Sequence, residues 1–307
     1  MNEIKAVIRQ TGPDFEVKTI EELGKGDFCR AFLVNKKFVY RFARHEKARQ
    51  SLRRENCLLP KMAGKFALEI PHPQFASLDG SAEKSFIAYP FLQNTALTPP
   101  EYLKLDEESR TRCAGQVARF LNELHSIDLE QAEKCRIPQI NYREKYTDLL
   151  ERIRETQFRV LEKADFEDAK NELEIYLESV DAVNFQPVLL HGDLSPDHVL
   201  FDKSSNHVTS IIDFGDMMIG DAAWDFLWIY EDYGTDFFAR AIAEYVVKDK
   251  KKFIERIVRF SIFETIAWIS ECLTNGEQDL AEAVEHLRAL KSIAVEINSF
   301  SDNPPAN

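Results

Sequence analysis

The segment that most constrains the fold runs from residue 187 to residue 216 and reads PVLLHGDLSPDHVLFDKSSNHVTSIIDFGD. Three apolar runs separated by polar loops, the pattern of short buried strands, cover residues 188–190, 199–201 and 208–212. The first run leads through His191 and Gly192 to Asp193, and the last leads directly into Asp213. These two predicted strands therefore each present a carboxylate at their end. The short excursion between them, which carries His198, allows the two acids to converge.

Phosphoryl transfer is a reaction that uses two such carboxylates. One orients the attacking hydroxyl group and can accept its proton, while the other helps to hold Mg²⁺ on the nucleotide phosphates. Asp193 suits the first role. Asp213 opens the string Asp-Phe-Gly-Asp and suits the second role, because Mg²⁺ prefers oxygen ligands.

The residues before Leu92 have a β-rich pattern. We expect a short amphipathic helix over residues 2–10 and a second helix over residues 46–63. Turn residues such as Asn35-Lys36 and Asp79-Gly80 separate the remaining apolar runs. The expected strands cover residues 15–23, 29–35, 37–43, 74–78 and 84–90.

After Leu92 the apolar residues recur at helical spacing. The clearest example is the series Ala114, Val117, Ala118, Leu121 and Leu124. Similar patterns cover residues 143–161, 166–181 and 234–298. The sequence therefore predicts an α+β chain with a small β-rich lobe over residues 1–92 and a larger, mainly helical lobe over residues 93–307.

The predicted β lobe contains groups that could bind a nucleotide. Gly24, Lys25 and Gly26 lie between two predicted strands, where glycines permit a tight turn and let backbone N–H groups approach phosphates. Arg41 is a cation within an apolar strand, and Glu55 on the following helix could pair with it. A hairpin turn and a surface ion pair are the simpler interpretations of these features, but their order along the chain favours a nucleotide site.

The charge balance restricts the partners of this chain. It has 39 Lys and Arg against 52 Asp and Glu, a formal net charge of −13, which would repel nucleic-acid phosphates and anionic lipid. We expect no nucleic acid and no membrane as partners, whereas a small cationic molecule is compatible with the charge. The first ten residues lack an apolar leader. No apolar stretch comes near the length of a membrane span, which is about 20 residues. We therefore expect a cytoplasmic protein.

The five cysteines are widely scattered. No C-x-x-C pair indicates a disulfide framework or a zinc site. We expect all of them to be reduced residues of the core; they are Cys29, Cys57, Cys113, Cys135 and Cys272.

Taken together, these motifs resemble the catalytic core of the aminoglycoside phosphotransferases, which are relatives of the protein kinases. The resemblance rests on the string from His191 to His198, on Ile212-Asp213-Phe214-Gly215-Asp216 and on the string from Gly220 to Phe226. The glycine turn and the segment 118–125 extend it, so that it covers residues 1–295. The pattern is most similar to the enzymes that phosphorylate the 2''-hydroxyl of gentamicin- and kanamycin-like drugs.

The resemblance implies a bilobal, protein-kinase-like fold and a role for each motif. Asp193 would be the catalytic base, and His191 would hold the catalytic loop in shape. Asp213 and His198 would hold Mg²⁺, although the imidazole could instead act through water or orient Asp193. Asp225 would be a buried acid that braces the same loop. The nucleotide, ATP or GTP, would contact the remaining predicted residues, which are Gly24, Lys25, Gly26, Arg41, Glu55, Tyr89 and Phe91.

The substrate end of the site is predicted from acidic and aromatic residues of the second lobe. A polyamine sugar carries several ammonium groups that carboxylates can bind, whereas a quaternary amine would prefer aromatic rings. The candidate substrate-binding residues are Asp216, Glu231, Asp232, Glu264 and Trp268.

The leading interpretation is an aminoglycoside kinase that uses Mg²⁺ and ATP or GTP. Two alternatives remain open at this stage. The same scaffold could phosphorylate another small alcohol, such as a macrolide, choline or homoserine. The substitution of Arg at position 41 and His at position 198 for the usual Lys and Asn also leaves open a nucleotide-binding regulator without catalysis.

Overall fold

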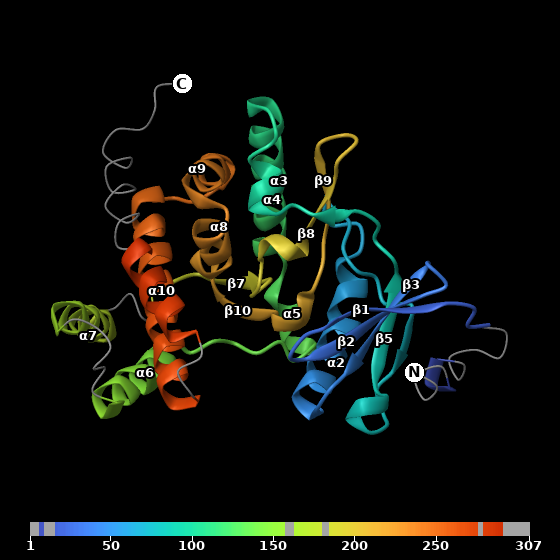
Figure 1. The fold of residues 1–307 in the computed structure, drawn as a ribbon, viewed down its shortest axis with the longest axis horizontal. Helices are drawn as coiled ribbons and strands as arrows, with labels where there is room; N and C mark the ends of the chain where they lie inside the picture. The colour runs from blue at the N-terminus through green and yellow to red at the C-terminus, as the bar shows by residue number, and fades with distance from the viewer. Residues whose placement is uncertain (1–5, 9–15, 157–162, 180–183, 276–278, 291–307) are drawn as a thin grey trace.

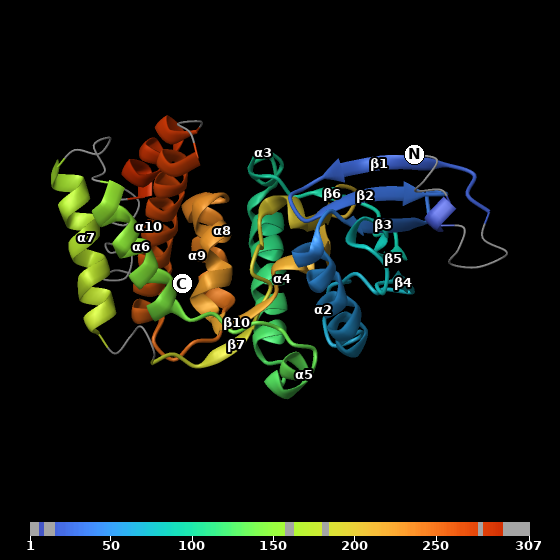
Figure 2. The same ribbon diagram turned by 90° about the horizontal axis from the view of Figure 1, so that it is seen from below.

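The computed structural model describes the chain except for residues 1–5, 9–15, 157–162, 180–183, 276–278 and 291–307. A β-sheet with one long helix lies at one end of the molecule and a group of helices at the other (Figures 1 and 2). The predicted bilobal α+β architecture is therefore confirmed. Of the expected helix over residues 2–10, residues 6–8 are helical and the others lie outside the described residues.

The first lobe is built on a five-stranded antiparallel sheet. Its strands follow the order β1 (Ile20–Lys25), β2 (Cys29–Val34), β3 (Phe38–Ala43), β5 (Phe86–Pro90) and β4 (Phe75–Ser77). Alternation along the strands gives the sheet two apolar faces. Phe32, Tyr40 and Phe86 belong to the cluster on one face, whereas Leu33 and Val39 belong to a smaller cluster. The first strand begins at Ile20 rather than at the predicted Phe15, and residues 9–15 are not described.

Helix α2 (Glu46–Met62) lies against this sheet (Figure 2). His45 caps its N-terminus by accepting a hydrogen bond from the Ala48 N–H. Leu52, Leu58 and Met62 lie on its buried side, so the apolar spacing of the helix fixes which face meets the rest of the protein. The predicted range of 46–63 differs from the observed helix by one residue.

The central strands form two small sheets in the second lobe. Strand β8 (Val199–Asp202) pairs with β9 (His207–Ile211) and with β6 (Thr95–Ala96). Strand β7 (Pro187–Leu190) pairs with β10 (Met218–Asp221), which the sequence analysis did not predict. A four-residue strand that ends in Gly220 and Asp221 has too few apolar residues to produce a periodic signal. Because β5 ends at Pro90 and β6 pairs with β8 of the second lobe, we propose a lobe boundary near residue 92.

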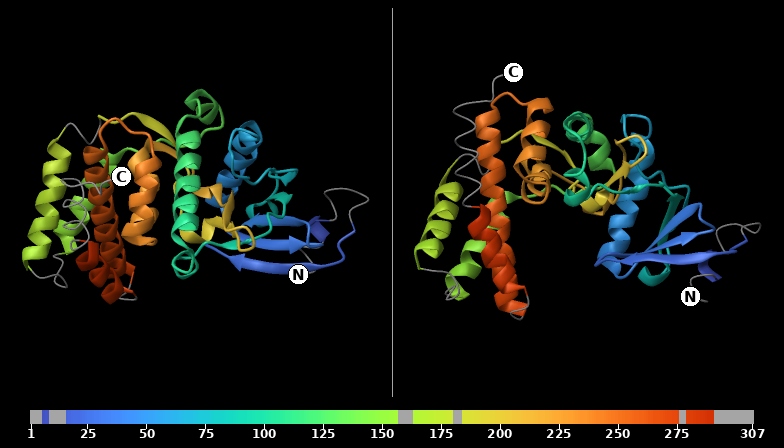
Figure 3. Two further views of the ribbon diagram at one scale, coloured as in Figure 1. Left: turned by 90° about the horizontal axis from the view of Figure 1, so that it is seen from above. Right: turned by 45° about the horizontal axis from the view of Figure 1, so that its top comes forward.

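Helices make up the rest of the second lobe, as the two further views in Figure 3 show. They are α3 (Pro99–Tyr102), α4 (Glu107–His125), α5 (Leu129–Lys134), α6 (Tyr142–Thr156), α7 (Lys163–Glu178), α8 (Leu227–Glu231), α9 (Gly234–Glu244) and α10 (Lys250–Asn275). The long helical pattern predicted over 234–298 is thus interrupted. The backbone is extended at Tyr245, which ends α9, and residues 280–290 form a further helical stretch. Residues 291–298 lie outside the described part of the chain.

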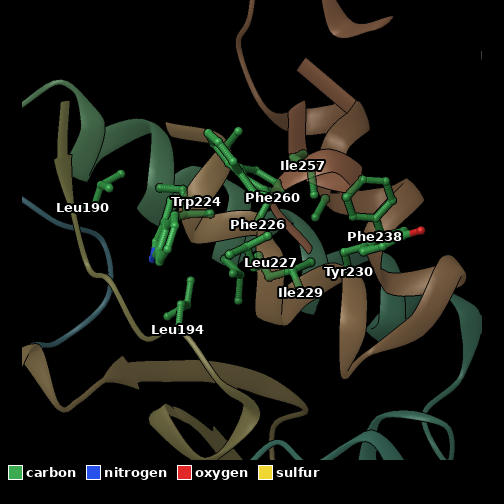
Figure 4. Packing of buried hydrophobic residues seen from close by; sticks show 14 of the residues in the cluster. Leu190, Leu194, Trp224, Phe226, Leu227, Ile229, Tyr230, Phe238, Ile257 and Phe260 are labelled. Carbon is green, nitrogen blue, oxygen red and sulfur yellow. The ribbon is translucent and has the colours of Figure 1, made fainter. Parts of the chain in front are cut away.

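The core of the second lobe brings the central strands against the helices that follow them. Leu190 and Leu194, which flank the predicted catalytic loop, belong to the same buried cluster as Trp224, Phe226 and Phe260 (Figure 4). The loop is therefore fixed at both ends by apolar side chains. In the part of the chain that the structure describes, no helix is long and apolar enough to cross a bilayer.

The cysteines differ from the sequence-based expectation. Cys29, Cys113 and Cys272 are free and buried, as predicted. Cys57 and Cys135, however, form a disulfide, so the prediction that all five are reduced is wrong. These two residues are separated by 78 positions, and only the packing of α2 beside the end of α5 brings them together.

Candidate active site

A cavity of about 520 Å³ lies between the two lobes. Its wall from the first lobe includes the predicted residues Gly24, Lys25, Gly26, Arg41, Tyr89 and Phe91. Its wall from the second lobe includes the predicted residues Asp193, His198, Asp213 and Asp216. Most of the residues that the sequence analysis selected therefore meet in one place, although they come from distant parts of the chain.

The loop that carries Asp193 depends on a glycine with an unusual backbone. Gly192 has a φ of +88°, and a Cβ atom at this position would lie 2.1 Å from the Asp216 carbonyl oxygen. Only glycine fits both the conformation and the space. Because the neighbouring atom belongs to the backbone, the clash cannot be relieved by rotating a side chain.

Replacing Gly192 with Ala is expected to lower the free energy of unfolding by about 2–3 kcal/mol or more, through backbone strain and displacement of the Asp216 segment. Chemical denaturation measures this loss. Gly80→Ala is the matched control, because nothing lies within 4 Å of the added carbon at that position. Equal stability of the two variants would contradict this account of the loop.

Asp225 holds the backbone of the same loop through hydrogen bonds. Its side chain is fully buried and accepts hydrogen bonds of 2.8 Å from the backbone N–H groups of His191 and Gly192. His125, at the end of α4, lies 3.1 Å from the same carboxylate through its Nε2 and 2.8 Å from the Tyr245 hydroxyl through its Nδ1. The buried carboxylate thus joins the loop to two helical segments.

His191 links the two acidic strand ends. Its Nδ1 accepts a hydrogen bond of 3.3 Å from the Asp193 N–H, which leaves Nε2 to donate to the Ile212 carbonyl oxygen at 3.0 Å. The backbone before Asp213 is therefore tied to the backbone of Asp193. Burial lowers the pKa of His191 to about 4, so the imidazole is neutral at pH 7.

The low pKa of His191 predicts a loss of stability in acid. The unfolded chain takes up a proton near pH 6.5 and the folded chain only near pH 4, so protons favour unfolding between these values. Glutamine does not titrate in this range. We therefore expect the difference between the unfolding free energies of wild type and His191→Gln to shrink by about 3 kcal/mol as the pH falls from 6.5 to 4. Urea unfolding of both proteins across this range measures it; a constant difference would exclude His191 as the titrating group.

His198 lies between Asp193, the predicted catalytic base, and Asp213, the predicted metal ligand. Its Nδ1 is 2.7 Å from the Asp193 carbonyl oxygen and 3.6 Å from Asp193 Oδ2, while its Nε2 is 3.7 Å from Asp213 Oδ2. Ser195 Oγ, at 3.2 Å, also contacts Nδ1. One ring nitrogen is thereby oriented by the loop, and the other faces Asp213 across the cavity.

Arg41 forms a fork between two acids. One guanidinium nitrogen lies 2.6 Å from Glu55 Oε2 on α2, and the other lies 2.6 Å from Asp213 Oδ1. Arg41 and Glu55 are buried, whereas 41% of the Asp213 side chain is exposed toward the cavity. This planar, two-pronged contact requires arginine rather than lysine.

The cavity acids differ in their proton affinity. Burial raises the pKa of Asp213, but the charge of Arg41, reinforced by His198 and by a hydrogen bond from the Gly215 N–H, more than offsets it, so this pKa lies below its usual value. Burial raises the pKa of Asp193, against the charge of His198, and that of Asp216, with a further contribution from Asp213. Burial also raises the pKa of Glu55 to about 7, against the charge of Arg41. The cation therefore keeps Asp213 ionised, while Asp193 binds a proton more readily.

The first-lobe residues predicted to contact the nucleotide differ in whether their backbone N–H groups are free to do so. Gly24 and Lys25 are part of the β1–β2 hairpin, and the Gly26 N–H donates to the Cys29 carbonyl oxygen at 3.0 Å. The Phe91 N–H donates to the Lys37 carbonyl oxygen at 2.7 Å, so it is not directed at the cavity. These residues line the cavity, but two of their N–H groups are already used within the protein.

The predicted substrate residues other than Asp216 do not line this cavity. Glu231 contacts Ser261 and lies 3.1 Å from His286 Nε2. Lys145 lies 2.9 Å from Glu264. Asp232 is accessible to solvent, but the protein around it removes part of its hydration, which together with the charge of Glu231 raises its pKa to about 6. The ring of Trp268 packs against that of His286 at 6.1 Å.

Sequence reasoning missed Ser51. This residue is buried on α2, one turn before Glu55, and its hydroxyl donates to the Gly215 carbonyl oxygen at 2.5 Å. Helix α2 therefore holds the Asp213 segment both through Arg41 and directly. The position of Ser51, four residues before Glu55 on the same helix face, was the only available signal.

The fold and the cavity define a class of protein. A β-rich lobe with a buried cation covers a helical lobe whose strand-end acids face the same space, and this is the arrangement of a kinase-type phosphotransferase. A model of the Phosphotransferase enzyme family matches residues 19–259. The chain belongs to this family, which confirms the resemblance predicted from the sequence.

Solved structures of aminoglycoside phosphotransferases are similar to this chain along most of its length. The GDP and kanamycin complex of APH(2")-IIia is 28% identical, with 95% of this chain and 99% of that chain covered and a TM-score of 0.86. The gentamicin complex of APH(2")-IIa is 22% identical, covers 94% and 95% of the two chains and has a TM-score of 0.76. The macrolide 2'-phosphotransferase MphH from Brachybacterium faecium is 19% identical, covers 100% of both chains and has a TM-score of 0.68. The last two similarities show a common fold only.

Proposed function

We propose that this protein transfers the γ-phosphoryl group of ATP or GTP to a hydroxyl group of an aminoglycoside. The observation that carries the proposal is the shared cavity, in which Asp193 and Asp213 face each other across His198. The GDP and kanamycin complex of the 28% identical structure supports the choice of nucleotide and drug class.

The residues of the cavity are suited to a nucleotide-bound Mg²⁺. Among the described residues, no group of three or more His, Cys, Asp or Glu forms a complete metal site. Mg²⁺ in phosphoryl-transfer sites is held by one or two carboxylates together with substrate phosphates and water, so a complete site is not required. Asp213 would be the carboxylate ligand, with His198 Nε2 beside it. Bound Mg²⁺ would supply positive charge that neutralises the phosphates during transfer.

The protein residues would then perform separate tasks. Asp193 would accept a hydrogen bond from the substrate hydroxyl, orient it toward the phosphate and take up its proton. The raised pKa of Asp193 improves its capacity as a proton acceptor. Arg41 would hold Asp213 in place through one guanidinium nitrogen. Because it lines the cavity, its positive charge would also attract the phosphates. His191 and Asp225 would keep the loop of Asp193 in position.

The acids of the second lobe support a cationic substrate. Asp193 and Asp216 line the cavity, and Asp232 on the same lobe is exposed. Glu231 and Glu264 already have His286 and Lys145 as partners. We therefore propose that Asp216 and Asp232 make the principal contacts with substrate ammonium groups, and that Glu231 and Glu264 contribute less.

A nucleotide-turnover assay across a substrate panel tests the proposed function. The panel contains kanamycin, gentamicin, a macrolide, choline and homoserine, each with ATP and with GTP. We expect drug-dependent release of ADP or GDP with at least one aminoglycoside and phosphate on the recovered drug by mass spectrometry. Turnover with the macrolide, choline or homoserine alone would replace aminoglycosides as the substrate class. A folded protein that binds nucleotide and turns over none of them would favour the regulator.

A further inference from the structure

The disulfide between Cys57 and Cys135 joins the two lobes. Cys57 lies on α2, which packs against the sheet of the first lobe, and Cys135 directly follows α5 of the second lobe. Their Cα atoms are 5.6 Å apart although 78 positions separate them along the chain. Figure 2 shows α2 and α5 close to each other. The bond is therefore a covalent connection across the lobe boundary, in addition to the chain itself.

The connected helix is the one that reaches the nucleotide cavity. Cys57 is two residues beyond Glu55, which holds Arg41, and six beyond Ser51, which holds the Gly215 carbonyl group. A bond at Cys57 consequently restrains the helix that positions both the buried cation and the Asp213 segment. The position of α2 relative to the second lobe can therefore depend on whether Cys57 and Cys135 are oxidised or reduced.

The surroundings of the two sulfur atoms favour exchange chemistry. Lys61 Nζ lies 3.4 Å from Cys57 Sγ and 3.1 Å from Cys135 Sγ. A neighbouring ammonium group stabilises a thiolate, which is the species that attacks disulfides and leaves from them. Lys61 is exposed and Cys57 is partly exposed, whereas Cys135 is buried. Cys57 is therefore the sulfur that a small reagent can reach first.

We propose that Cys57 and Cys135 form a reversible thiol–disulfide site that controls the freedom of the two lobes, with a low-molecular-weight disulfide as its oxidant. The Cys57 thiolate attacks the small disulfide, forming a mixed disulfide and releasing one small thiolate. The Cys135 thiolate then attacks Cys57 Sγ, forms the protein disulfide and releases the second small thiolate. The two cysteines lose two electrons and two protons in total, and the small disulfide is reduced to two thiols.

Closing this bond is expected to slow the exchange of nucleotide. Release of a nucleotide from between two lobes requires them to separate, and such opening often limits turnover. The oxidised protein cannot move the end of α2 away from α5. This consequence rests on the proposed nucleotide site, whereas the existence and the reversibility of the bond do not.

Peptide mapping of the full-length protein tests the bond itself. One sample is treated with glutathione disulfide and one with dithiothreitol, and free thiols are alkylated after denaturation. We expect the cross-linked Cys57–Cys135 peptide only in the oxidised sample, its loss when dithiothreitol is added to the folded protein, and alkylation of Cys29, Cys113 and Cys272 in both. A stable glutathione adduct at Cys57, a different pairing or two free thiols after oxidation would each overturn the proposal.

Thermal unfolding and nucleotide release test the effect on the lobes. Oxidised wild type is expected to unfold about 5 °C above the reduced protein, because the bond closes a long loop. It is also expected to release a fluorescent nucleotide at least about threefold more slowly. The Cys57→Ser/Cys135→Ser variant should show neither difference. An identical response of this variant to glutathione disulfide would overturn the assignment. If the melting shift is present but no nucleotide binds in either state, the proposed function fails and the disulfide site stands.

Discussion

Replacing Asp193 with Asn is expected to lower kcat by about 10²–10⁴-fold, the usual contribution of a positioned proton acceptor. Asparagine retains the shape of the side chain but cannot take up the proton of the substrate hydroxyl. Because Asp193 is one of several groups around the cavity, nucleotide affinity should change little. Steady-state turnover and equilibrium binding of nucleotide, measured on the same preparation, separate these two effects.

The control for this variant is Asp197→Asn. Asp197 lies on the same loop, carries the same charge and is exposed to solvent, but it does not line the cavity. We expect the kcat of this variant to stay within about twofold of the wild-type value, as for a substitution on the surface away from the site. A comparable loss of turnover in both variants would mean that the net charge of the loop, and not the position of Asp193, supports the reaction.

Replacing Arg41 with Met is expected to lower the free energy of unfolding by about 3–5 kcal/mol, because one partner is removed from a buried ion pair. Glu55 would remain buried without its cation, and burial already raises its pKa to about 7, so it would take up a proton near neutral pH. Asp213 would lose the group that orients Oδ1. Chemical denaturation measures the stability loss, and the nucleotide KM should rise in the same variant.

Arg30 on the neighbouring strand provides a matched control. It also forms an ion pair with a glutamate, at 3.0 Å from Glu22, but both side chains are at least one third exposed. Solvent screens such a pair, and Arg30→Met should cost less than about 1 kcal/mol. Arg41→Lys is the second comparison: it keeps the charge but cannot contact Glu55 and Asp213 as a planar fork. Equal losses for Arg41→Met and Arg30→Met would contradict the role assigned to burial.

The sequence predicted the architecture well where the periodic signal was long. Apart from β1, which begins at Ile20 and not at the predicted Phe15, the sheet strands and α2 follow the expected ranges to within two residues, because alternating and helical apolar patterns directly determine which face is buried. Two short strands, β6 and β10, were missed, since β6 has only two residues and β10 has only two apolar residues before Gly220 and Asp221. The helical pattern over 234–298 did not reveal the end of α9, because no glycine or proline directly follows Glu244, whereas Gly276 directly after α10 was an available stop signal.

The site was predictable for residues within motifs and less so for contacts between distant segments. Asp193 and Asp213 were identified because each follows an apolar strand directly. The double contact of Arg41, the hydrogen bond of Ser51 and the Cys57–Cys135 bond depend on how α2 packs against the second lobe, which no local pattern encodes. Glu231 and Glu264 were selected as acids of the right region, but their pairing with His286 and Lys145 is a tertiary property.

Asp225 has a further consequence for how this protein can change over time. It supports the loop of Asp193 through His191, Gly192 and His125, and all of these groups belong to the helical lobe. Among the contacts described above, Arg41 and Ser51 join the sheet lobe to the Asp213 segment, and neither of them bonds to Asp225. Substitutions in the sheet lobe can therefore accumulate while the loop of Asp193 keeps its support from Asp225. In the proposed reaction, selection of the nucleotide and activation of the acceptor hydroxyl would then be able to evolve separately.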